Sequence, residues 1–443
     1  MDSIQNASLS VPSGRVAFIG ENTRVFYDDL NQMVKHNAEA LDRLRGATAV
    51  INGRARLELA LLLFLLDGVA KRILFLPQDI EQAQRKEFFR LANVNFDVLI
   101  NDGCIEVKEI TPYQAGDVSA VVQTEWVIPT SGTTSTPKLV SHTFASLTRT
   151  AKKDIELGCN FVWGLVFDVY RFSGLQVLLQ SLLSGSTLIV PEAESSMEEV
   201  VNLLCQHNCN TLSATPSFWR KMLMTKESKS IKFKNITLGG EIADSNILNA
   251  LKSRYPEAGI RHIYASTEAG VGFSVNDGIA GFPCTYLDED INGIKLKVDD
   301  RGILWLKPNT REQKYVNGAP MFDEDGFINT GDLVELKEER VYFLGRESGA
   351  INVGGNKVQP EEVERTILDS GLVSAAYVYA ISNPMMGSLV CANIVAVEKG
   401  VKATELKKQV TIFCRERLEN FKVPALLKMV EELEITNSGK LKR

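Results

Sequence analysis

The sequence predicts an α/β fold: a large N-terminal domain of α/β sheets with a small β-rich subdomain, followed by a small, mobile α+β domain. From about residue 28 to residue 268, short apolar runs alternate with helical patterns, which is typical of parallel sheets covered by helices. From about residue 292, short strands and turn sequences follow one another. Helices and strands alternate again beyond Gly345, so we expect two domains, 1–346 and 347–443.

The first elements follow from hydrophobic spacing. Asp28 or Asp29 can cap a helix that runs to about Arg45, where Gly46 can end it. A helix over 55–66 is apolar nearly all round, and we therefore expect it to be buried. We expect strands at 73–76 and 98–100, separated by a polar helix over 80–91.

The same reasoning gives the later elements. We expect helices at 144–157, 174–183, 197–206 and 218–224, and strands at 186–190, 211–214, 236–238 and 261–264. The β-rich part is expected to hold strands at 294–298, 302–306, 334–337 and 341–344. The last domain is expected to hold helices at 360–368 and 404–418 and strands at 375–381 and 390–397.

Composition excludes several classes of protein. The net charge of −6 argues against a general nucleic-acid binder. The longest apolar run, over 59–66, is too short to span a bilayer, and the first residues lack a signal-peptide pattern. Seven scattered cysteines favour free thiols in a reducing compartment. We therefore expect a cytoplasmic protein with no membrane partner.

Cys205, His207 and Cys209 are spaced like part of a zinc site. A structural zinc site needs four ligands, and no second pair of ligands accompanies them. The surrounding pattern fits the end of an amphipathic helix better than a metal site.

A loop rich in hydroxyl groups is the first candidate functional segment. It comprises Thr130, Ser131, Gly132, Thr133, Thr134 and Ser135, and it closes with Lys138. Hydroxyls, backbone N–H groups and a cation suit a loop that binds polyphosphate, although Ser/Thr-rich linkers share this composition. The spacing differs from the common phosphate loop, because no second glycine precedes Lys138.

Two further segments follow predicted strands. Gly239, Gly240 and Glu241 end one strand, and Ala265, Ser266, Thr267 and Glu268 end the next, after Tyr264. Ligands of open α/β sheets gather at the carboxyl ends of strands, so we expect these segments and the hydroxyl loop to share one crevice.

With four later motifs, these segments resemble the adenylate-forming (AMP-binding) superfamily of acyl- and aryl-CoA synthetases and peptide-synthetase adenylation domains. The later motifs are Thr330-Gly331-Asp332, Gly345-Arg346, the stretch from Ile351 through Gly354-Gly355 to Glu364, and Asn437-Ser-Gly-Lys440. The resemblance covers nearly the whole chain. The segment from Gly354 to Val363 is also similar to short o-succinylbenzoate–CoA ligases.

The resemblance implies an ATP site with named parts. The hydroxyl loop and Lys138 would bind the β- and γ-phosphates, and Thr267 and Glu268 would bind Mg²⁺, which prefers oxygen ligands. Gly239, Gly240, Glu241 and Tyr264 would contact adenine, while Asp332 and Arg346 would contact ribose or phosphate. Lys440, Glu268 and Lys138 would be catalytic, with Lys440 reaching the α-phosphate from the mobile domain. Structural roles such as turn capping for Asp332 or a surface ion pair for Arg346 remain alternatives.

The resemblance also implies a thiol-transfer step. Rotation about a hinge at Ser348 would bring Gly354 and Gly355 to a channel for coenzyme A or a carrier-protein phosphopantetheine.

This chain departs from the family pattern at several positions. Ser135 and Leu139 replace glycines of the phosphate loop, and Ala265 replaces a glycine after Tyr264. Arg171 stands where the family has an aromatic or histidine residue, in an acid pocket that would include Gly174, Ser266 and Gly270. Arg171 either pairs with a second acidic group of the substrate or pairs with Asp168, and we favour the pairing with Asp168. His142 either contacts phosphate or orders the loop, and we favour the ordering role.

We therefore expect ATP- and Mg²⁺-dependent activation of a carboxylic acid to an acyl-adenylate, with release of pyrophosphate, and transfer to a thiol, coenzyme A by preference. The alternatives are a stand-alone enzyme that loads a carrier protein and a degenerate, non-catalytic adenylation fold.

Overall fold

Four β-sheets organise the computed structural model, which describes residues 3–53, 55–77, 80–114, 122–130, 138–383, 386–398 and 400–433. The first, called here the distal sheet, has seven strands in the order β18-β8-β7-β4-β3-β5-β6. Its inner strands pair in parallel, whereas β6, β8 and β18 are antiparallel. Its strands are β3 (Thr48–Ile51), β4 (Arg72–Phe75), β5 (Phe96–Asn101), β6 (Cys104–Glu109), β7 (Glu125–Pro129), β8 (Leu139–His142) and β18 (Lys314–Tyr315).

The second, called the central sheet, has eight strands in the order β14-β13-β12-β11-β9-β10-β1-β2. All neighbours from β13 to β1 pair in parallel, and the two edge strands are antiparallel. Its strands are β1 (Val16–Ile19), β2 (Arg24–Phe26), β9 (Val162–Leu165), β10 (Thr187–Ile189), β11 (Thr211–Ala214), β12 (Asn235–Gly239), β13 (Gly259–Ser266) and β14 (Gly270–Val275).

Two buried helices join these sheets. Helix α4 (Arg56–Leu66) is buried from Leu59 to Leu66, as its apolar sequence predicts, and shares one core with α8 (Phe172–Leu183). That core also contains strand residues of both sheets, such as Ile73 and Leu165. The opposite face of the central sheet packs against α9 (Met197–Gln206), α10 (Pro216–Met224) and α11 (Ser245–Arg254).

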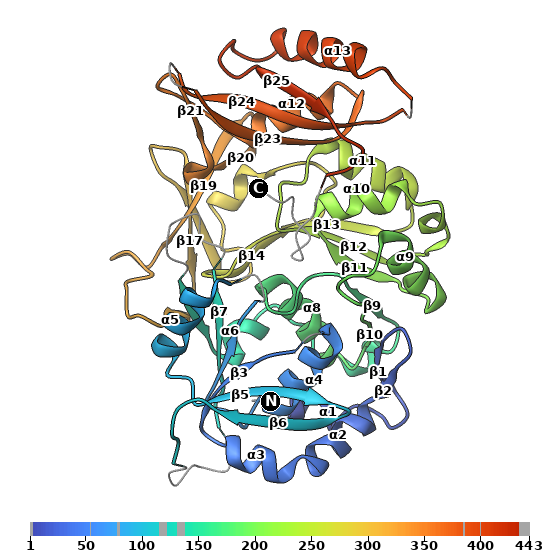
Figure 1. Ribbon diagram of the computed structural model, residues 1–443, viewed down its shortest axis with the longest axis vertical. Coiled ribbons are helices and arrows are strands. Elements are labelled where there is room, and N and C mark those ends of the chain that lie inside the picture. The colour runs from blue at the N-terminus through green and yellow to red at the C-terminus, as the bar shows by residue number, and fades with distance from the viewer. Residues whose placement is uncertain are drawn as a thin grey trace.

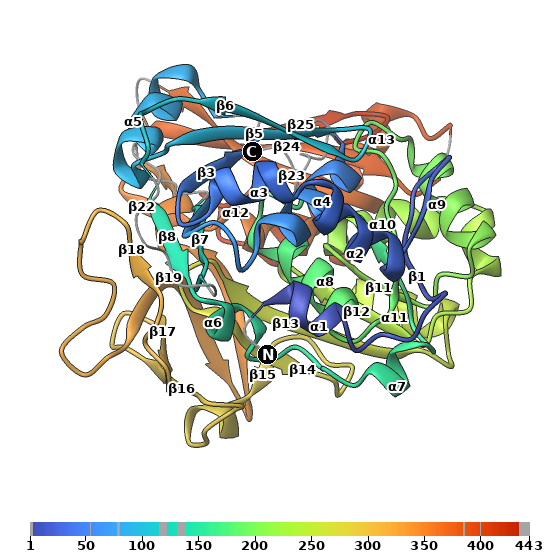
Figure 2. The ribbon, with the colours of Figure 1, turned by 90° about the horizontal axis from the view of Figure 1, so that it is seen from below.

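The third sheet, called the β-rich sheet, is antiparallel and lies beside the central sheet, away from α9 and α10 (Figures 1 and 2). Its strands are β15 (Phe282–Pro283), β16 (Ile294–Val298), β17 (Ile303–Pro308), β19 (Ile328–Lys337) and β20 (Arg340–Arg346).

The fourth sheet, called the C-terminal sheet, begins at Ile351, five residues beyond the end of β20. It contains β21 (Ile351–Val353), β22 (Asn356–Val358), β23 (Val373–Asn383), β24 (Gly387–Ala396) and β25 (Leu426–Met429), with helices α12 (Pro360–Asp369) and α13 (Ala403–Arg415). These elements enclose their own core and lie over α10 and α11 (Figure 1). The Asn246 amide donates to the Asp369 carboxylate across this contact, at 3.0 Å.

The predicted α/β fold class is confirmed, but several predicted elements are wrong in extent. The helix expected to reach Arg45 is two helices, α2 (Tyr27–His36) and α3 (Ala38–Leu44), with a break at Asn37. The helix expected over 144–157 is α6 (Phe144–Thr148) and α7 (Ile155–Gly158), because the Asp154 side chain accepts from the Leu157 N–H and caps a new helix. Helix α5 (Gln82–Ala92) starts two residues later than expected. No helix in the described ranges is long and apolar enough to cross a membrane.

Candidate active site

One cleft of about 3020 Å³ lies between the central sheet, the β-rich sheet and the C-terminal sheet. The carboxyl ends of β12 and β13 open into it, as expected for a parallel sheet. Twelve of the predicted site residues line it: Thr130, Arg171, Gly239, Gly240, Glu241, Tyr264, Ala265, Ser266, Thr267, Glu268, Asp332 and Arg346.

Other predicted site residues do not line this cleft. They are Lys138, Gly174, Gly270, Ser348, Gly354 and Gly355. Ser131, Gly132, Thr133, Thr134, Ser135 and Lys440 lie outside the described residues. The structure therefore describes the two ends of the hydroxyl loop but not the loop itself.

The Asp332 carboxylate receives two hydrogen bonds from the protein. The Tyr264 hydroxyl donates to Oδ2, and the Arg346 Nε donates to Oδ1 at 3.1 Å. Asp332 on β19 and Arg346 at the end of β20 are directly opposite in the antiparallel ladder, which brings the pair together. A carboxylate has about four lone-pair sites, so two remain for hydroxyl groups of a ligand such as ribose.

The Tyr264 ring is packed between strands rather than isolated. It stacks on Phe273 and Phe343, with centroid distances of 5.4 and 5.0 Å. Burial, together with the neighbouring Asp332 charge, raises the pKa of the Tyr264 hydroxyl well above its usual value. The hydroxyl therefore stays protonated and acts as a donor that fixes the Asp332 side chain.

His142 joins the hydroxyl-loop strand β8 to the turn that contains Glu268. Its Nε2 lies 2.7 Å from the Thr267 carbonyl oxygen, and its Nδ1 lies 3.2 Å from the Ser146 hydroxyl. Burial lowers the pKa of His142 to about 4, so the ring is neutral at pH 7 and its Nε2–H donates to Thr267. No local sequence pattern indicates this contact, because it joins residues 125 positions apart. We predicted that His142 orders the hydroxyl loop, whereas the observed contact orders the turn at Thr267 and Glu268.

Two hydrogen bonds join the ends of the hydroxyl loop. The Thr130 N–H donates to the Lys138 carbonyl at 2.8 Å, and the Lys138 N–H donates to the Thr130 hydroxyl at 3.3 Å. The Lys138 ammonium lies over the Tyr315 ring, 4.6 Å from its centroid. Burial and the nearby Glu268 charge raise the pKa of Tyr315 to about 12. Lys138 and Glu268 are thus both neighbours of Tyr315.

Glu268 suits an oxygen-binding cation. Within the described ranges, no hydrogen bond or ion pair joins its carboxylate to another residue. A hydrogen bond stabilises the turn that contains Glu268: the Ser266 hydroxyl accepts from the Ala269 N–H at 3.0 Å. One carboxylate plus substrate phosphates is the usual set of ligands for Mg²⁺ at nucleotide sites, so these residues fit the metal.

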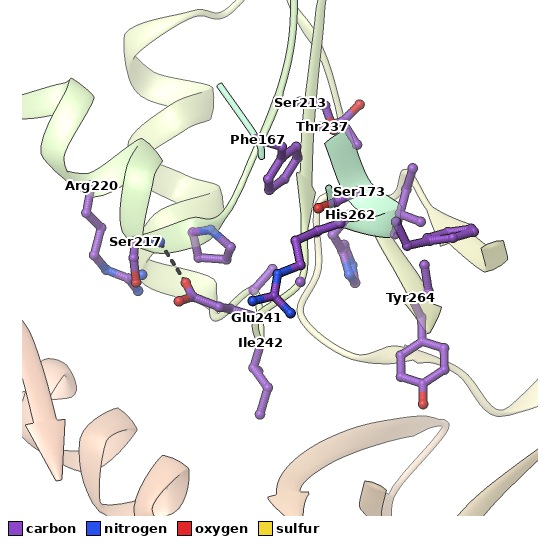
Figure 3. A pocket seen from close by; sticks show the side chains of 18 of the residues that line it. Phe167, Ser173, Ser213, Ser217, Arg220, Thr237, Glu241, Ile242, His262 and Tyr264 are labelled. Atoms are coloured by element: carbon purple, nitrogen blue, oxygen red, sulfur yellow. Dashed lines mark hydrogen bonds between the residues drawn. The ribbon is translucent and has the colours of Figure 1, made fainter. Parts of the chain in front are cut away.

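Glu241 connects the Gly239–Glu241 segment to α10. Its Oε2 accepts from the Ser217 N–H at 2.9 Å, at the first turn of that helix (Figure 3). A carboxylate at a helix N-terminus is favoured by the helix dipole. Gly240 has φ +82°, a conformation that favours glycine, so the Gly-Gly turn is needed to direct Glu241 toward α10.

The predicted acid-pocket residues differ in their environment. Arg171 is the N-cap residue of α8 and lines the cleft. Gly174 is needed for packing, because a Cβ there would stand 2.2 Å from the Asp168 carbonyl oxygen. Gly270 has φ +73° and borders a much smaller pocket with His142.

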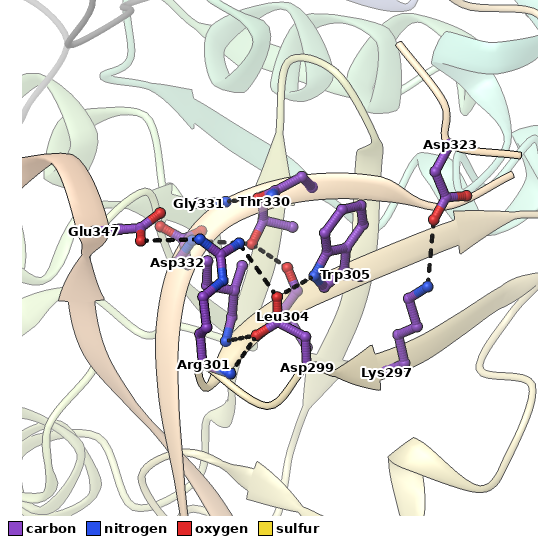
Figure 4. Close-up of polar contacts among 12 residues, drawn as sticks. Lys297, Asp299, Arg301, Leu304, Trp305, Asp323, Thr330, Gly331, Asp332 and Glu347 are labelled. Carbon is purple, nitrogen blue, oxygen red and sulfur yellow. Dashed lines mark hydrogen bonds and ion pairs between the residues drawn. The ribbon is translucent and has the colours of Figure 1, made fainter. Parts of the chain in front are cut away.

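The predicted hinge residue Ser348 lies in a short 3-10 helix, Glu347–Gly349, between β20 and β21. Figure 4 shows how this helix is tied to the β-rich sheet: Arg301 pairs with Glu347 at 3.4 Å and with Asp299 at 3.5 Å. Asp299 in turn accepts from the Trp305 indole at 3.1 Å. The segment before the C-terminal sheet is thus attached through an exposed arginine.

Gly354 and Gly355 form the turn between β21 and β22. Their φ angles are +58° and +91°, and the Gly354 N–H donates to the Met386 carbonyl at 2.8 Å. A Cβ on Gly354 would stand 2.7 Å from the Met386 methyl group, whereas Gly355 has open space around it. The turn is therefore accessible on one side.

Two family models match the chain. The model described as AMP-binding enzyme matches residues 104–299, and the model described as AMP-binding enzyme C-terminal domain matches residues 362–440. The chain is 27% identical to a 2-succinylbenzoate–CoA ligase of Bacillus velezensis, over 99% of this chain and 96% of the relative. It is 27% identical to enterobactin synthase component E of Escherichia coli, over 70% of this chain and 62% of the relative.

The fold has the same architecture as solved structures. The anthranilate CoA ligase AuaEII in complex with anthranoyl-AMP superimposes with a TM-score of 0.79 at 16% identity, covering 99% of this chain and 94% of that one. Since both family models and the fold agree with the order of the sequence motifs, the chain belongs to the adenylate-forming, AMP-binding enzymes and is an acid–thiol ligase of the AMP-forming class.

Proposed function

We propose that this enzyme makes the coenzyme A thioester of a carboxylic acid in two steps within the cleft. In the first, the acid carboxylate attacks the α-phosphorus of ATP, and pyrophosphate leaves. In the second, the CoA thiol attacks the acyl carbon, and AMP leaves. The observation that carries the proposal is the convergence of the Thr130 loop end, the Gly239–Glu241 and Tyr264–Glu268 segments, and Asp332 on one cleft.

The contacts support a role for each segment in this proposal. Asp332, held by Tyr264 and Arg346, binds the ribose hydroxyls, and Gly239, Gly240 and Glu241 lie beside adenine. Thr267 and Glu268 would hold Mg²⁺, and the ion would supply neutralisation of phosphate charge. The hydroxyl loop and Lys138 bind the leaving pyrophosphate. Because an anion attacks an anion, catalysis consists mainly of charge neutralisation and in-line positioning.

The two steps need two positions of the C-terminal domain. We assign ATP and acid binding to residues 1–346 and the closing lid to residues 347–443. With the lid closed for the first step, Lys440 reaches the α-phosphate. Rotation about Ser348 then removes Lys440 and brings the Gly354-Gly355 turn to the thiol. The separate core of the C-terminal sheet supports movement as a unit.

We propose that the enzyme acts in the cytoplasm. We also propose coenzyme A as the thiol, because several relatives are named 2-succinylbenzoate–CoA ligase. An aromatic acid with a second carboxylate is therefore our first choice of substrate class.

Acid-dependent ATP–pyrophosphate exchange across a panel of acids tests the first step, and thioester formation with CoA tests the second. We expect both activities with the same acid. If exchange occurs and a carrier protein's phosphopantetheine is loaded, but no CoA thioester forms, then the acceptor is the carrier protein and not CoA. A folded protein that supports no exchange with any acid would contradict the proposal and favour a non-catalytic fold.

A further inference from the structure

The cleft continues from the strand ends along one face of the central sheet. In the parallel register Ser213 pairs with Thr237 and Thr237 pairs with Arg261, which makes one row of side chains. Thr211 and Asn235 make a second row, two residues earlier on the same strands. Residues two apart on a strand share a face, and all five residues line the cleft. The wall beyond the strand ends is therefore polar.

The opposite wall comes from α8 and the loop before it. Phe167, Ser173, Gln176 and Gln180 line it, and Figure 3 shows Phe167 and Ser173 near the Ser213–Thr237 row. The side-chain amides of Gln176 and Gln180 donate to the carbonyls of Leu147 and Thr150, at 2.9 and 3.0 Å. These hydrogen bonds fix the α8 wall in place. A ligand between the two walls would lie alongside hydroxyl and amide groups.

Arg261 is the cation of the strand wall. Its only side-chain hydrogen bond within the described ranges is a long one, from Nη2 to the Asn235 Oδ1 at 3.4 Å, and no described acidic residue pairs with it. By contrast, two other arginines of the cleft are paired: Arg220 with Asp244, and Arg346 with Asp332. A half-buried guanidinium without an anion loses hydration that a bound anion would offset.

A second donor lies on the same wall. Trp163 faces the cleft in the Thr211–Asn235 row, and its indole Nε1 is buried with no hydrogen-bond partner among the described residues. Buried donors without partners are rare in native structures. Because this nitrogen is covered by the protein, a ligand acceptor could bond to it only after neighbouring side chains move, and Arg261 remains the donor that faces the cleft.

We propose that Arg261 binds a second anionic group of the acid, a carboxylate by class, and so selects dicarboxylic acids. This inference rests on the proposed function, because it assumes that the other carboxylate is activated at the strand ends. Arg261 lies two residues back from the Gly239–Ile263 pair, and Asn235 lies four residues back from Gly239. At about 3.3 Å per residue, the two carboxylates are expected about 7–13 Å apart, beyond the reach of malonate.

Matched acids that differ by one carboxylate test the assignment. The probes are 2-succinylbenzoate against 4-oxo-4-phenylbutanoate, and octanedioate against octanoate, in acid-dependent ATP–pyrophosphate exchange. We expect the wild-type kcat/KM to favour the dicarboxylate by about 10- to 100-fold, as expected for a charge-assisted hydrogen bond. Arg261→Gln should lower that ratio at least tenfold. The matched control is Arg254→Gln, which removes a part-buried arginine outside the cleft and should leave the ratio unchanged.

Arg261→Lys gives a second readout if the glutamine variant does not fold. Because lysine keeps the charge on a shorter and differently shaped side chain, the preferred dicarboxylate in a series from pentanedioate to decanedioate should lengthen. Equal use of mono- and dicarboxylates by the wild type, an unchanged ratio in folded Arg261→Gln, or an unchanged length preference in Arg261→Lys overturns the assignment while leaving the ligase function intact. Absence of exchange with every acid overturns both.

Discussion

Tyr264 illustrates how a single hydroxyl group orders a binding residue. Its ring is fixed by Phe273 and Phe343, and its hydroxyl reaches Asp332 from another sheet. Aromatic packing therefore positions a polar contact. The sequence suggested that this ring stacks on adenine, and that role stays a prediction.

Tyr264→Phe should raise the KM for ATP about 3- to 10-fold with a smaller effect on kcat, because it removes one hydrogen bond and keeps the packing. Steady-state kinetics at saturating acid would measure this. Tyr286→Phe is the control, since its hydroxyl donates to Ser274 in the same aromatic cluster but does not contact Asp332. An equal rise in both variants would mean that packing, not the Asp332 contact, is responsible.

At the scale of elements, sequence patterns predicted the bounds of a helix correctly where residues at its own ends determine them. Helix α9 has the predicted bounds because Ser196 and Glu199 form a capping box at its start. The strand at 162–165 was missed because a four-residue run without alternation carries a weak signal, and the strand at 104–109 was missed although Ile105 and Val107 alternate with polar residues. Helix α11, capped by Asp244, was missed as well.

The candidate site was predicted by motif order rather than by geometry. Asp332 and Arg346 were named from separate motifs, but their pairing depends on the register of β19 and β20. The contact of His142 with Thr267 depends on how two sheets pack, which no local pattern encodes. The polar wall with Arg261 likewise appears only once four strands are aligned.

The β21–β22 turn gives a prediction at this scale. Gly354→Ala should leave ATP–pyrophosphate exchange near the wild-type rate and slow CoA thioester formation several-fold. The added methyl group displaces the Met386 side chain and narrows the turn that we assign to the thiol channel. The φ of +58° costs an alanine about 1 kcal/mol, so the hairpin should survive. Equal loss of both half-reactions would contradict the assignment.

At the scale of the whole molecule, two buried groups give opposite dependences of stability on pH. Burial raises the pKa of Asp67 to about 7, although its carboxylate accepts from the Ile4 N–H at 2.7 Å. The folded state keeps this proton while the unfolded state loses it, so stability falls as pH rises from about 4 to 7. His142, with its pKa lowered to about 4, contributes stability that is lost as pH falls from about 6.5 to 4.

Asp67→Asn should therefore make the free energy of unfolding rise more steeply with pH. Between pH 4.5 and 6.5 the slope should exceed that of the wild type by about 1.4 kcal/mol per pH unit, the value for one proton. Urea unfolding at three pH values would measure it. His142→Gln should change the slope in the opposite direction, and identical slopes in all three proteins would contradict both pKa shifts.

The position of Trp163 in the cleft has an optical consequence. Of the four tryptophans, Trp126 and Trp219 are fully buried in the core and Trp305 donates to Asp299 on the β-rich sheet, whereas Trp163 lines the cleft. An acid that enters along the polar wall changes the surroundings of one indole and leaves the other three in place. Intrinsic fluorescence can thus follow the arrival of the acid before any bond is made, separately from the binding of nucleotide at the strand ends.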